Sequence, residues 1–96
     1  KLKGLFALTV NGDSMIDSYI ADGDMVLMEP VNDPSRLRNG TVVSAMVPGL
    51  GTTLKHFFRD GSLVRLEAAN TAYEPIEIDA EQVHVQGKLA AVWRQT

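Results

Sequence analysis

Residues 52–68 read TTLKHFFRDGSLVRLEA, two strand-like runs on either side of an Asp-Gly pair. Both runs, 52–58 and 63–68, are short, and the first follows a turn-forming segment rich in proline and glycine at 48–51. Asp60-Gly61 is the strongest two-residue hairpin signal in the chain, because a type I′ turn needs positive φ at both central positions. The stretch therefore predicts a β-hairpin.

The rest of the chain repeats this pattern of short apolar runs punctuated by glycine or proline, which is typical of β-strands. Only residues 14–20 hint at helical spacing, and Gly87 inside the last run predicts a bulge or bend. Further strands are expected at 5–10, 25–28, 41–47, 75–78 and 83–93. We therefore predict an all-β fold: twisted antiparallel sheets or a partly closed β-barrel, with about seven strands and at most one or two short helical turns.

The amino-acid composition argues against several classes of protein and of functional site for this chain. The 96 residues include no cysteine, 45% are hydrophobic, and nine Lys and Arg stand against twelve Asp and Glu for a net charge of −3. We expect one domain over residues 1–96, without disulfides, zinc-cysteine sites or a thiol nucleophile. The basic residues are scattered along the sequence and form no continuous positive stripe, so we do not expect this segment to bind nucleic acid. No apolar stretch approaches the roughly 20 residues of a membrane span, and no signal peptide is recognisable, which favours a cytoplasmic protein.

Ser14, in the stretch Gly12-Asp13-Ser14-Met15, is open to two interpretations. A serine on a sharp glycine-containing turn exposes its hydroxyl near converging backbone N–H groups, an arrangement suited to a nucleophile with its oxyanion donors. The same serine, followed three residues later by Asp17, also fits a helix-capping pattern. The local pattern alone favours the cap.

A serine nucleophile needs a base, and Lys55 is one candidate. Period-2 alternation places Thr53, Lys55 and Phe57 on one face of a strand, and apolar surroundings lower a lysine pKa because the charged form loses hydration. The alternative is an ordinary lysine on a solvated face. His56 and His84 lie within strand-like runs, where a packed or edge histidine is the commoner outcome.

The acidic turns give no metal site. Asp13, Asp17, Asp22 and Asp24 cannot be aligned with a calcium-binding loop, and the pair Asp22-Gly23-Asp24 is typical of a tight turn. We therefore expect neither a metal nor a cofactor.

Six blocks in collinear order carry a resemblance to a known family. They are VNGDSM at 10–15, IADGD at 20–24, NGTVV at 39–43, TLK at 53–55, LEAANTAYEPI at 66–76 and VQGKLAAVWR at 85–94. Each block is weak alone, but together, from about residue 5 to residue 94, they resemble the C-terminal domain of LexA-type repressors. That family also includes the UmuD-type mutagenesis proteins and phage repressors, and its Ser-Lys dyad recurs in signal peptidases.

The resemblance implies a latent serine endopeptidase. It makes Ser14 the nucleophile, Lys55 the general base, and the backbone N–H groups of Asp13 and Ser14 the oxyanion donors. Such a domain cleaves its own chain at an upstream Ala-Gly bond when a RecA–ssDNA filament stimulates it. Cleavage separates the DNA-binding domain from the dimerising one and ends repression of DNA-damage genes in the SOS response. The homodimer contact of the family maps to residues 83–94.

One departure from the family concerns the cleavage site. Thirteen residues precede Ser14, and no Ala-Gly pair occurs in the 96 residues. We therefore expect the scissile bond and the DNA-binding domain to lie outside this sequence. The alternative function is a UmuD-type polymerase accessory subunit or a phage repressor domain that acts mainly as a non-catalytic dimerisation or binding module.

Overall fold

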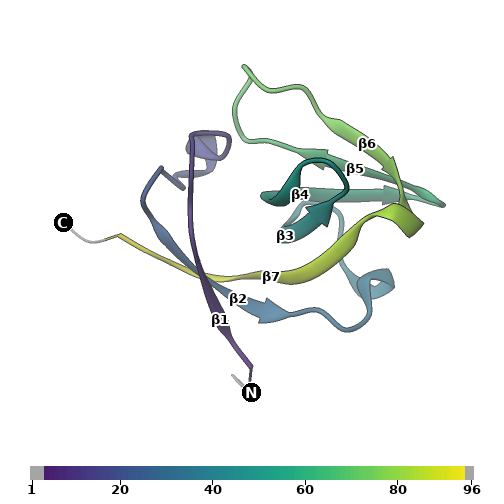
Figure 1. Cartoon of the computed structure of the whole chain (residues 1–96), viewed down its shortest axis with the longest axis horizontal. Helices are drawn as coiled ribbons and strands as arrows, with labels where there is room; N and C mark the ends of the chain where they lie inside the picture. The colour runs from purple at the N-terminus through teal and green to yellow at the C-terminus, as the bar shows by residue number, and fades with distance from the viewer. Residues whose placement is uncertain (1–3, 95–96) are drawn as a thin grey trace.

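The computed structural model describes residues 4–94, which form one antiparallel sheet with three single-turn 3-10 helices (Figure 1). The strands are β1 (Phe6–Thr9), β2 (Met25–Pro30), β3 (Thr41–Val47), β4 (Gly51–Asp60), β5 (Leu63–Glu67), β6 (Ile76–Asp79) and β7 (His84–Trp93), and the helices are η1 (Ile16–Ser18), η2 (Pro34–Arg36) and η3 (Ala80–Gln82). The predicted all-β fold is confirmed. None of the helices in residues 4–94 has the length and apolar character needed to cross a membrane.

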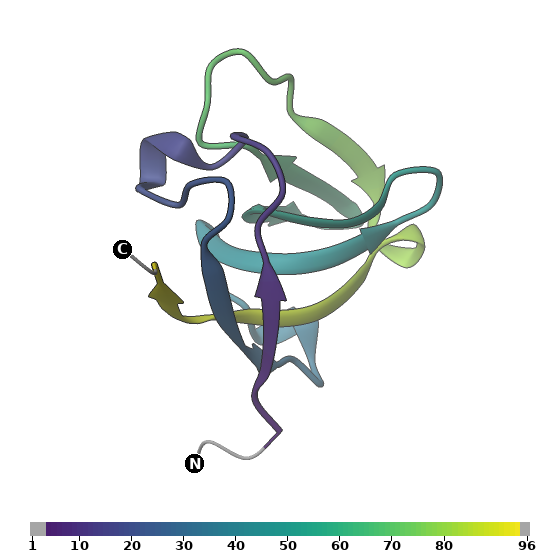
Figure 2. The same ribbon diagram turned by 60° about the vertical axis from the view of Figure 1, so that its left-hand side comes forward.

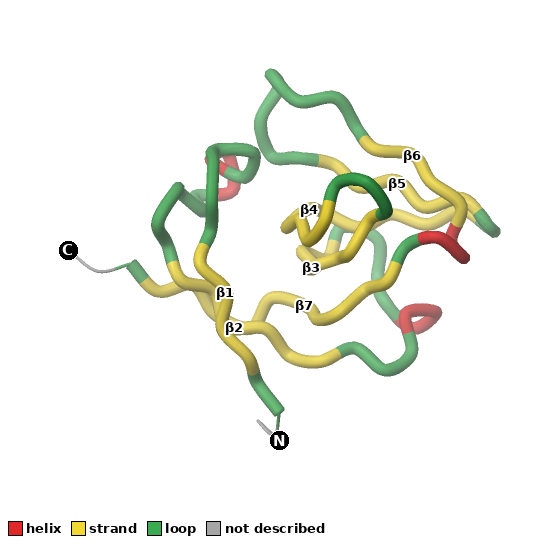
Figure 3. The backbone as a smooth tube through the Cα atoms, viewed as in Figure 1, coloured by secondary structure: helices red, strands yellow, loops and turns green. Residues whose placement is uncertain are grey.

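The strand order is β1-β2-β7-β3-β4-β5-β6, so the last strand inserts between β2 and β3 (Figure 3). Every neighbouring pair is antiparallel. The sheet twists and curls, but in the described residues β1 and β6 each pair on one side only, so the sheet is open (Figure 2). The insertion of β7 ties the end of the chain to the first third of the sequence.

The hairpin between β4 and β5 forms as predicted, but its turn differs from the prediction. Asp60 pairs with Leu63, so the two loop residues are Gly61 and Ser62. In the described residues only Gly61 of this turn has positive φ (62°), which fits a type II′ turn rather than type I′. Burial sets this register, because Phe57 opposite Leu66 places both side chains in the core and a one-residue slip would turn Leu66 outward.

Buried apolar side chains form two clusters. The larger lies on β3, β4, β5 and β7 and comprises Val43, Ala45, Val47, Phe57, Val64, Leu66 and Val85. The smaller joins two residues of β2 to two residues of the loop between β1 and β2, and comprises Met15, Ile20, Val26 and Met28. The smaller cluster therefore fixes the loop that contains Ser14 onto the sheet.

The irregularity predicted at Gly87 is confirmed. The register of β7 against β3 shifts beside Gly87, where Gln86 has no partner residue on β3. A Cβ atom on Gly87 would lie 2.8 Å from the Phe6 ring and 2.9 Å from the Glu29 carbonyl oxygen. Glycine is thus required here because the Phe6 ring of β1 and the Glu29 carbonyl of β2 both lie against the backbone of β7.

We expect Gly87→Ala to lower the free energy of unfolding by about 1–3 kcal/mol, because the added methyl group overlaps both the Phe6 ring and a backbone oxygen. Urea denaturation followed by circular dichroism measures the change. Lys88→Ala, at the exposed neighbouring position, is the control and should leave the midpoint nearly unchanged. Equal midpoints for Gly87→Ala and the parent would contradict the close approach.

Candidate active site

Ser14 lies in the loop between β1 and β2, beside Gly12 at φ 97°. The Gly12 N–H donates to Asp22 Oδ1 at 2.6 Å, and the adjacent Met15 side chain is buried in the smaller cluster. These two contacts hold the loop on both sides of Ser14, whose own side chain is half-buried.

The capping interpretation of Ser14 is wrong. The residue at the N-cap of η1 is Met15, and no side chain caps that helix. The Ser14 hydroxyl oxygen instead lies 3.1 Å from Lys55 Nζ, which reaches it from 41 positions along the chain. The local sequence pattern favoured the cap because it contains no information about Lys55, which lies on the distant strand β4.

Lys55 is buried, with 8% of its surface exposed, so the solvated-lysine alternative is also wrong. Its Nζ donates to Thr53 Oγ1 at 2.6 Å, and Phe57, on the same face of β4, is in the core, as the alternation predicted. Burial lowers the pKa of Lys55, because the ammonium form loses hydration. In residues 4–94 no carboxylate pairs with Nζ to offset this loss.

The edge of β4 beside Ser14 is free. β5 pairs with β4 only from His56 to Asp60, so residues 51–55 have no sheet partner on that side in the described chain. The end of β1, the Ser14 loop and the start of β4 enclose a pocket of about 300 Å³, lined by Ser14, Lys55 and residues 8–11 and 52–54 among others. The two groups therefore face a groove bounded by strands with unpaired edges.

The backbone around Ser14 has free donors. Within residues 4–94, the N–H groups of Asp13 and Ser14 donate no hydrogen bond. The Asp13 carbonyl oxygen, by contrast, accepts from Asn70 Nδ2 at 2.9 Å and from the Ile16 N–H at 3.3 Å. Two unpaired N–H groups next to a hydroxyl can stabilise a negatively charged oxygen.

The connection between β5 and β6 braces this loop, as Figure 2 shows where it arches beside η1. Besides the contact of Asn70, the Tyr73 hydroxyl donates to Asp13 Oδ1 at 2.6 Å, and this hydrogen bond raises the pKa of Tyr73. The Asp17 N–H donates to the Ala69 carbonyl at 2.7 Å. We did not predict these contacts, since no local pattern links residues more than 50 positions apart.

In the described chain no hydrogen bond joins either histidine to Ser14. His56 Nδ1 lies 2.8 Å from the Gly40 carbonyl oxygen, to which it can only donate, and Nε2 lies 3.0 Å from the Ser18 hydroxyl. His56 thus joins η1 to β4. His84 is exposed on β7, opposite Met46.

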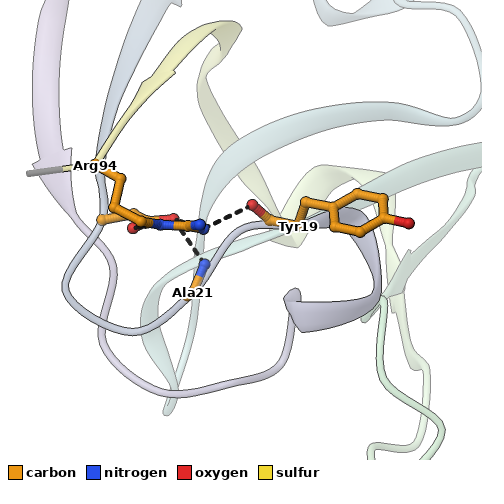
Figure 4. A network of polar contacts seen from close by, with 4 residues as sticks. Tyr19, Ala21 and Arg94 are labelled. Carbon is orange, nitrogen blue, oxygen red and sulfur yellow. Dashed lines mark hydrogen bonds and ion pairs between the residues drawn. The ribbon is translucent and has the colours of Figure 1, made fainter. Parts of the chain in front are cut away.

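An ion pair between the buried Asp24 carboxylate and the exposed Arg94 side chain holds the far end of the Ser14 loop (Figure 4). Asp24, only 2% exposed, accepts from Arg94 Nε and Nη2, both at 2.8 Å, and from the Ala21 N–H at 2.8 Å. Arg94 Nη2 also donates to the Tyr19 carbonyl at 3.1 Å. Hydrogen bonding from Arg94 lowers the pKa of Asp24 to about 2. Asp24 therefore has a structural role, because it holds the loop to Arg94. The described residues contain no group of three or more side chains that could bind a metal ion.

Sequence comparison identifies relatives over nearly the whole chain. The peptidase S24-like family profile matches residues 1–90. The LexA repressors of Koribacter versatilis and Roseiflexus sp. are 43% and 44% identical over 97% and 98% of the chain, and that of Zymomonas mobilis is 39% identical over 94%. The chain covers 43%, 42% and 40% of these relatives, respectively, so it spans about two fifths of their length.

We expect the Asp24–Arg94 pair to make the free energy of unfolding depend on pH in the acid range. Because the folded state lowers the pKa of Asp24 from 3.8 to about 2, the pair stabilises the fold above that range and loses its effect as pH falls through it. We expect Arg94→Met to unfold at lower urea concentration at neutral pH and to lose less stability on acidification than the parent.

Arg65→Met is the matched control, because Arg65 pairs with Glu67 on the surface, where ion pairs contribute little. Urea midpoints at neutral pH and at pH about 3 test the difference. An equal loss of stability on acidification in the parent and in Arg94→Met would exclude this role of Asp24.

Proposed function

The chain belongs to the peptidase S24-like family, and we propose that residues 1–96 are the serine endopeptidase and dimerisation domain of a LexA-type repressor. The observation that carries the proposal is the 3.1 Å distance between Lys55 Nζ and Ser14 Oγ. The buried amine lacks a carboxylate partner in the described residues, and its pKa is lowered. A neutral amine at hydrogen-bond distance from a hydroxyl is a suitable general base.

In the proposed reaction, neutral Lys55 takes the proton of the Ser14 hydroxyl as Oγ attacks the carbonyl carbon of the scissile bond. The carbonyl electrons move onto its oxygen, which the N–H groups of Asp13 and Ser14 stabilise. One such donor typically contributes on the order of 10²–10³ in rate. The Lys55 ammonium then protonates the leaving amine as the C–N bond breaks.

Hydrolysis of the resulting ester repeats these roles. Lys55 removes a proton from water, the hydroxide attacks the ester carbonyl, and the proton returns to Oγ as the Ser14–acyl bond breaks. Thr53 accepts a hydrogen bond from Nζ at 2.6 Å and so keeps the amine beside Ser14 throughout.

The groove supports an extended peptide as the substrate. Residues 51–55 of β4 and the edge strand β1 both offer unpaired backbone groups beside Ser14 in the described chain. An extended segment bound there would form main-chain hydrogen bonds as an added strand. We propose that this segment carries the Ala-Gly bond implied by the family resemblance.

The remaining elements of the proposal concern the longer protein. LexA repressors are more than twice the length of this chain, which leaves room for an upstream DNA-binding domain. We propose that a RecA–ssDNA filament stimulates self-cleavage in the bacterial cytoplasm and so ends repression of SOS genes. The relatives reported above are named LexA repressors, which favours this role over a UmuD-type accessory subunit or a phage repressor domain.

We further propose that the protein dimerises through residues 83–94. β3 pairs with β7 only up to Lys88, so the rest of β7 has an unpaired edge in the described chain. Val92 and Trp93, 41% and 60% exposed, lie at this end of the strand. A free edge with exposed apolar side chains suits pairing with a second copy.

The peptidase proposal is tested in an extended chain, defined as the 96 residues preceded by the upstream segment of the Koribacter versatilis LexA repressor. We expect self-cleavage to follow first-order kinetics and to accelerate as pH rises, because Lys55 must lose its proton. The rate should level off below the ordinary lysine pKa of 10.5, since burial lowers that of Lys55. Gel analysis gives the rate, and mass spectrometry identifies the new N-terminus.

Ser14→Ala and Lys55→Met should each slow this cleavage by at least about 10³-fold. Arg38→Met, which removes an exposed cation from the loop before β3, is the control and should cleave at the parent rate. Cleavage at the parent rate in Lys55→Met would refute the dyad.

The dimer is tested by Trp93→Glu, which places a charge on the free edge of β7. We expect its dimer dissociation constant, measured by sedimentation equilibrium, to rise by about 10-fold or more, as for a central interface aromatic. Leu50→Glu, at an equally exposed position (61%) in the turn between β3 and β4, should associate like the parent. Equal effects of the two substitutions would place the interface elsewhere.

A further inference from the structure

The Asn70 side chain, in the connection between β5 and β6, makes two hydrogen bonds. Its Oδ1 accepts from the Ala72 N–H at 2.9 Å, which braces its own loop. Its Nδ2 donates at 2.9 Å to the carbonyl oxygen of Asp13, 57 positions earlier in the chain. The two contacts together fix the orientation of the amide, since only the nitrogen end can donate to a carbonyl.

The contact with Asp13 determines where the next N–H group points. The peptide between Asp13 and Ser14 is trans, as are the others described, so its C=O and N–H groups point in opposite directions. Because the Asp13 carbonyl faces Asn70, the Ser14 N–H faces away from it. That N–H has no acceptor in residues 4–94, and Ser14 lines the pocket that also contains Lys55.

We infer that Asn70 is a positioning residue that orients the Asp13–Ser14 peptide so that the Ser14 N–H serves as an oxyanion donor. The inference rests on the proposed peptidase function. Asn70 does not touch the reacting atoms; it acts through the peptide. Without its contact the Asp13 carbonyl keeps only the longer hydrogen bond from the Ile16 N–H, at 3.3 Å, so the direction of the Ser14 N–H is held less firmly.

Two neighbouring contacts make it possible to distinguish the orientation of the Asp13–Ser14 peptide from the attachment of the two loops to each other. The hydrogen bond from the Asp17 N–H to the Ala69 carbonyl joins the same two loops and does not involve the Asn70 side chain. Tyr73 binds the carboxylate of Asp13, not its peptide carbonyl. Truncating Asn70 should therefore leave the loops attached, and removing the Tyr73 hydroxyl should leave the peptide oriented.

The experiment uses the extended chain with Asn70→Ala and Asn70→Asp. We expect each to slow self-cleavage about 10- to 100-fold, in line with misalignment of one catalytic group. For Asn70→Ala, the pH midpoint of the rate should not move, because in residues 4–94 the hydrogen bonds of the Asn70 side chain go to Asp13 and Ala72 and none goes to Lys55. Asn70→Asp keeps the acceptor for the Ala72 N–H but replaces the donor to Asp13 with a negatively charged oxygen, so it removes the contact with Asp13 while the loop contact is kept.

A second readout does not depend on cleavage. A peptide boronate of the substrate sequence forms a tetrahedral adduct with Ser14 that places an oxygen in the oxyanion site. Its affinity for Asn70→Ala should fall by a factor similar to the rate, whereas the affinity of the unmodified peptide should stay within about twofold. A purely structural role of Asn70 would instead weaken both ligands alike and lower the unfolding midpoint.

Two control variants complete the test. Tyr73→Phe should change the rate less than about threefold, because it leaves the Asp13 carbonyl contact intact. Asn39→Ala removes the same residue type, one that accepts from the Arg59 N–H at the hairpin, and should cleave like the parent.

The results that would contradict the role of Asn70 differ from the result that would contradict the proposed peptidase function. Parent-like rate and boronate affinity in Asn70→Ala, or an equal loss in Tyr73→Phe, would overturn the inference while the Ser14–Lys55 dyad stands. Unfolding of both Asn70 variants would overturn it too, by showing a structural role. Cleavage that persists in Ser14→Ala would overturn the proposed function itself.

Discussion

The amine of Lys55 is buried, and in residues 4–94 no carboxylate lies beside it to balance a positive charge. The other features of the site depend on this one. Burial alone disfavours the ammonium form and lowers the pKa of Lys55. A nearby carboxylate would restore the charged form and remove the base. The only described polar partners of Nζ are two hydroxyl groups, those of Ser14 and Thr53, which accept a hydrogen bond without supplying a negative charge.

Keeping Ser14 at this amine requires a loop that is held from several directions. Met15 anchors the loop in the core, Asp24 fixes its far end through Arg94 on β7, and Asn70 holds the peptide before Ser14. The loop also contains Tyr19, the one non-glycine residue with positive φ in residues 4–94, whose carbonyl Arg94 binds. Such a conformation persists where its surroundings impose it.

Much of the fold could be predicted from the sequence, because strand patterns are local. The alternation at 52–58 predicted that Thr53 lies beside Lys55, and the glycine at 87 predicted the irregularity in β7. The turn after β4 was predicted one residue early, since burial of Leu66, a tertiary effect, sets its register. The family resemblance came from the order of six blocks, each of which was too weak alone.

The candidate site was less accessible to local patterns, because its contacts join distant residues. The capping motif at Ser14 matched well and was wrong, since the true partner of the hydroxyl lies 41 positions away. Asp24 had the sequence of an ordinary turn, and its burial depends on Arg94, 70 positions later. The local pattern made Lys55 only one candidate base for Ser14, and the family resemblance was needed to prefer it over a solvated lysine.

Unpaired strand edges are normally a liability, because they can pair with other chains. In the described chain they occur on β1, on β6, on residues 51–55 of β4 and on the end of β7. Three of the four border the Ser14 groove or the proposed dimer contact. β6 is only four residues long, which limits what it can pair with. An open sheet of this kind can present one edge to a substrate and another to a second copy, which a closed barrel, with every edge paired, could not do.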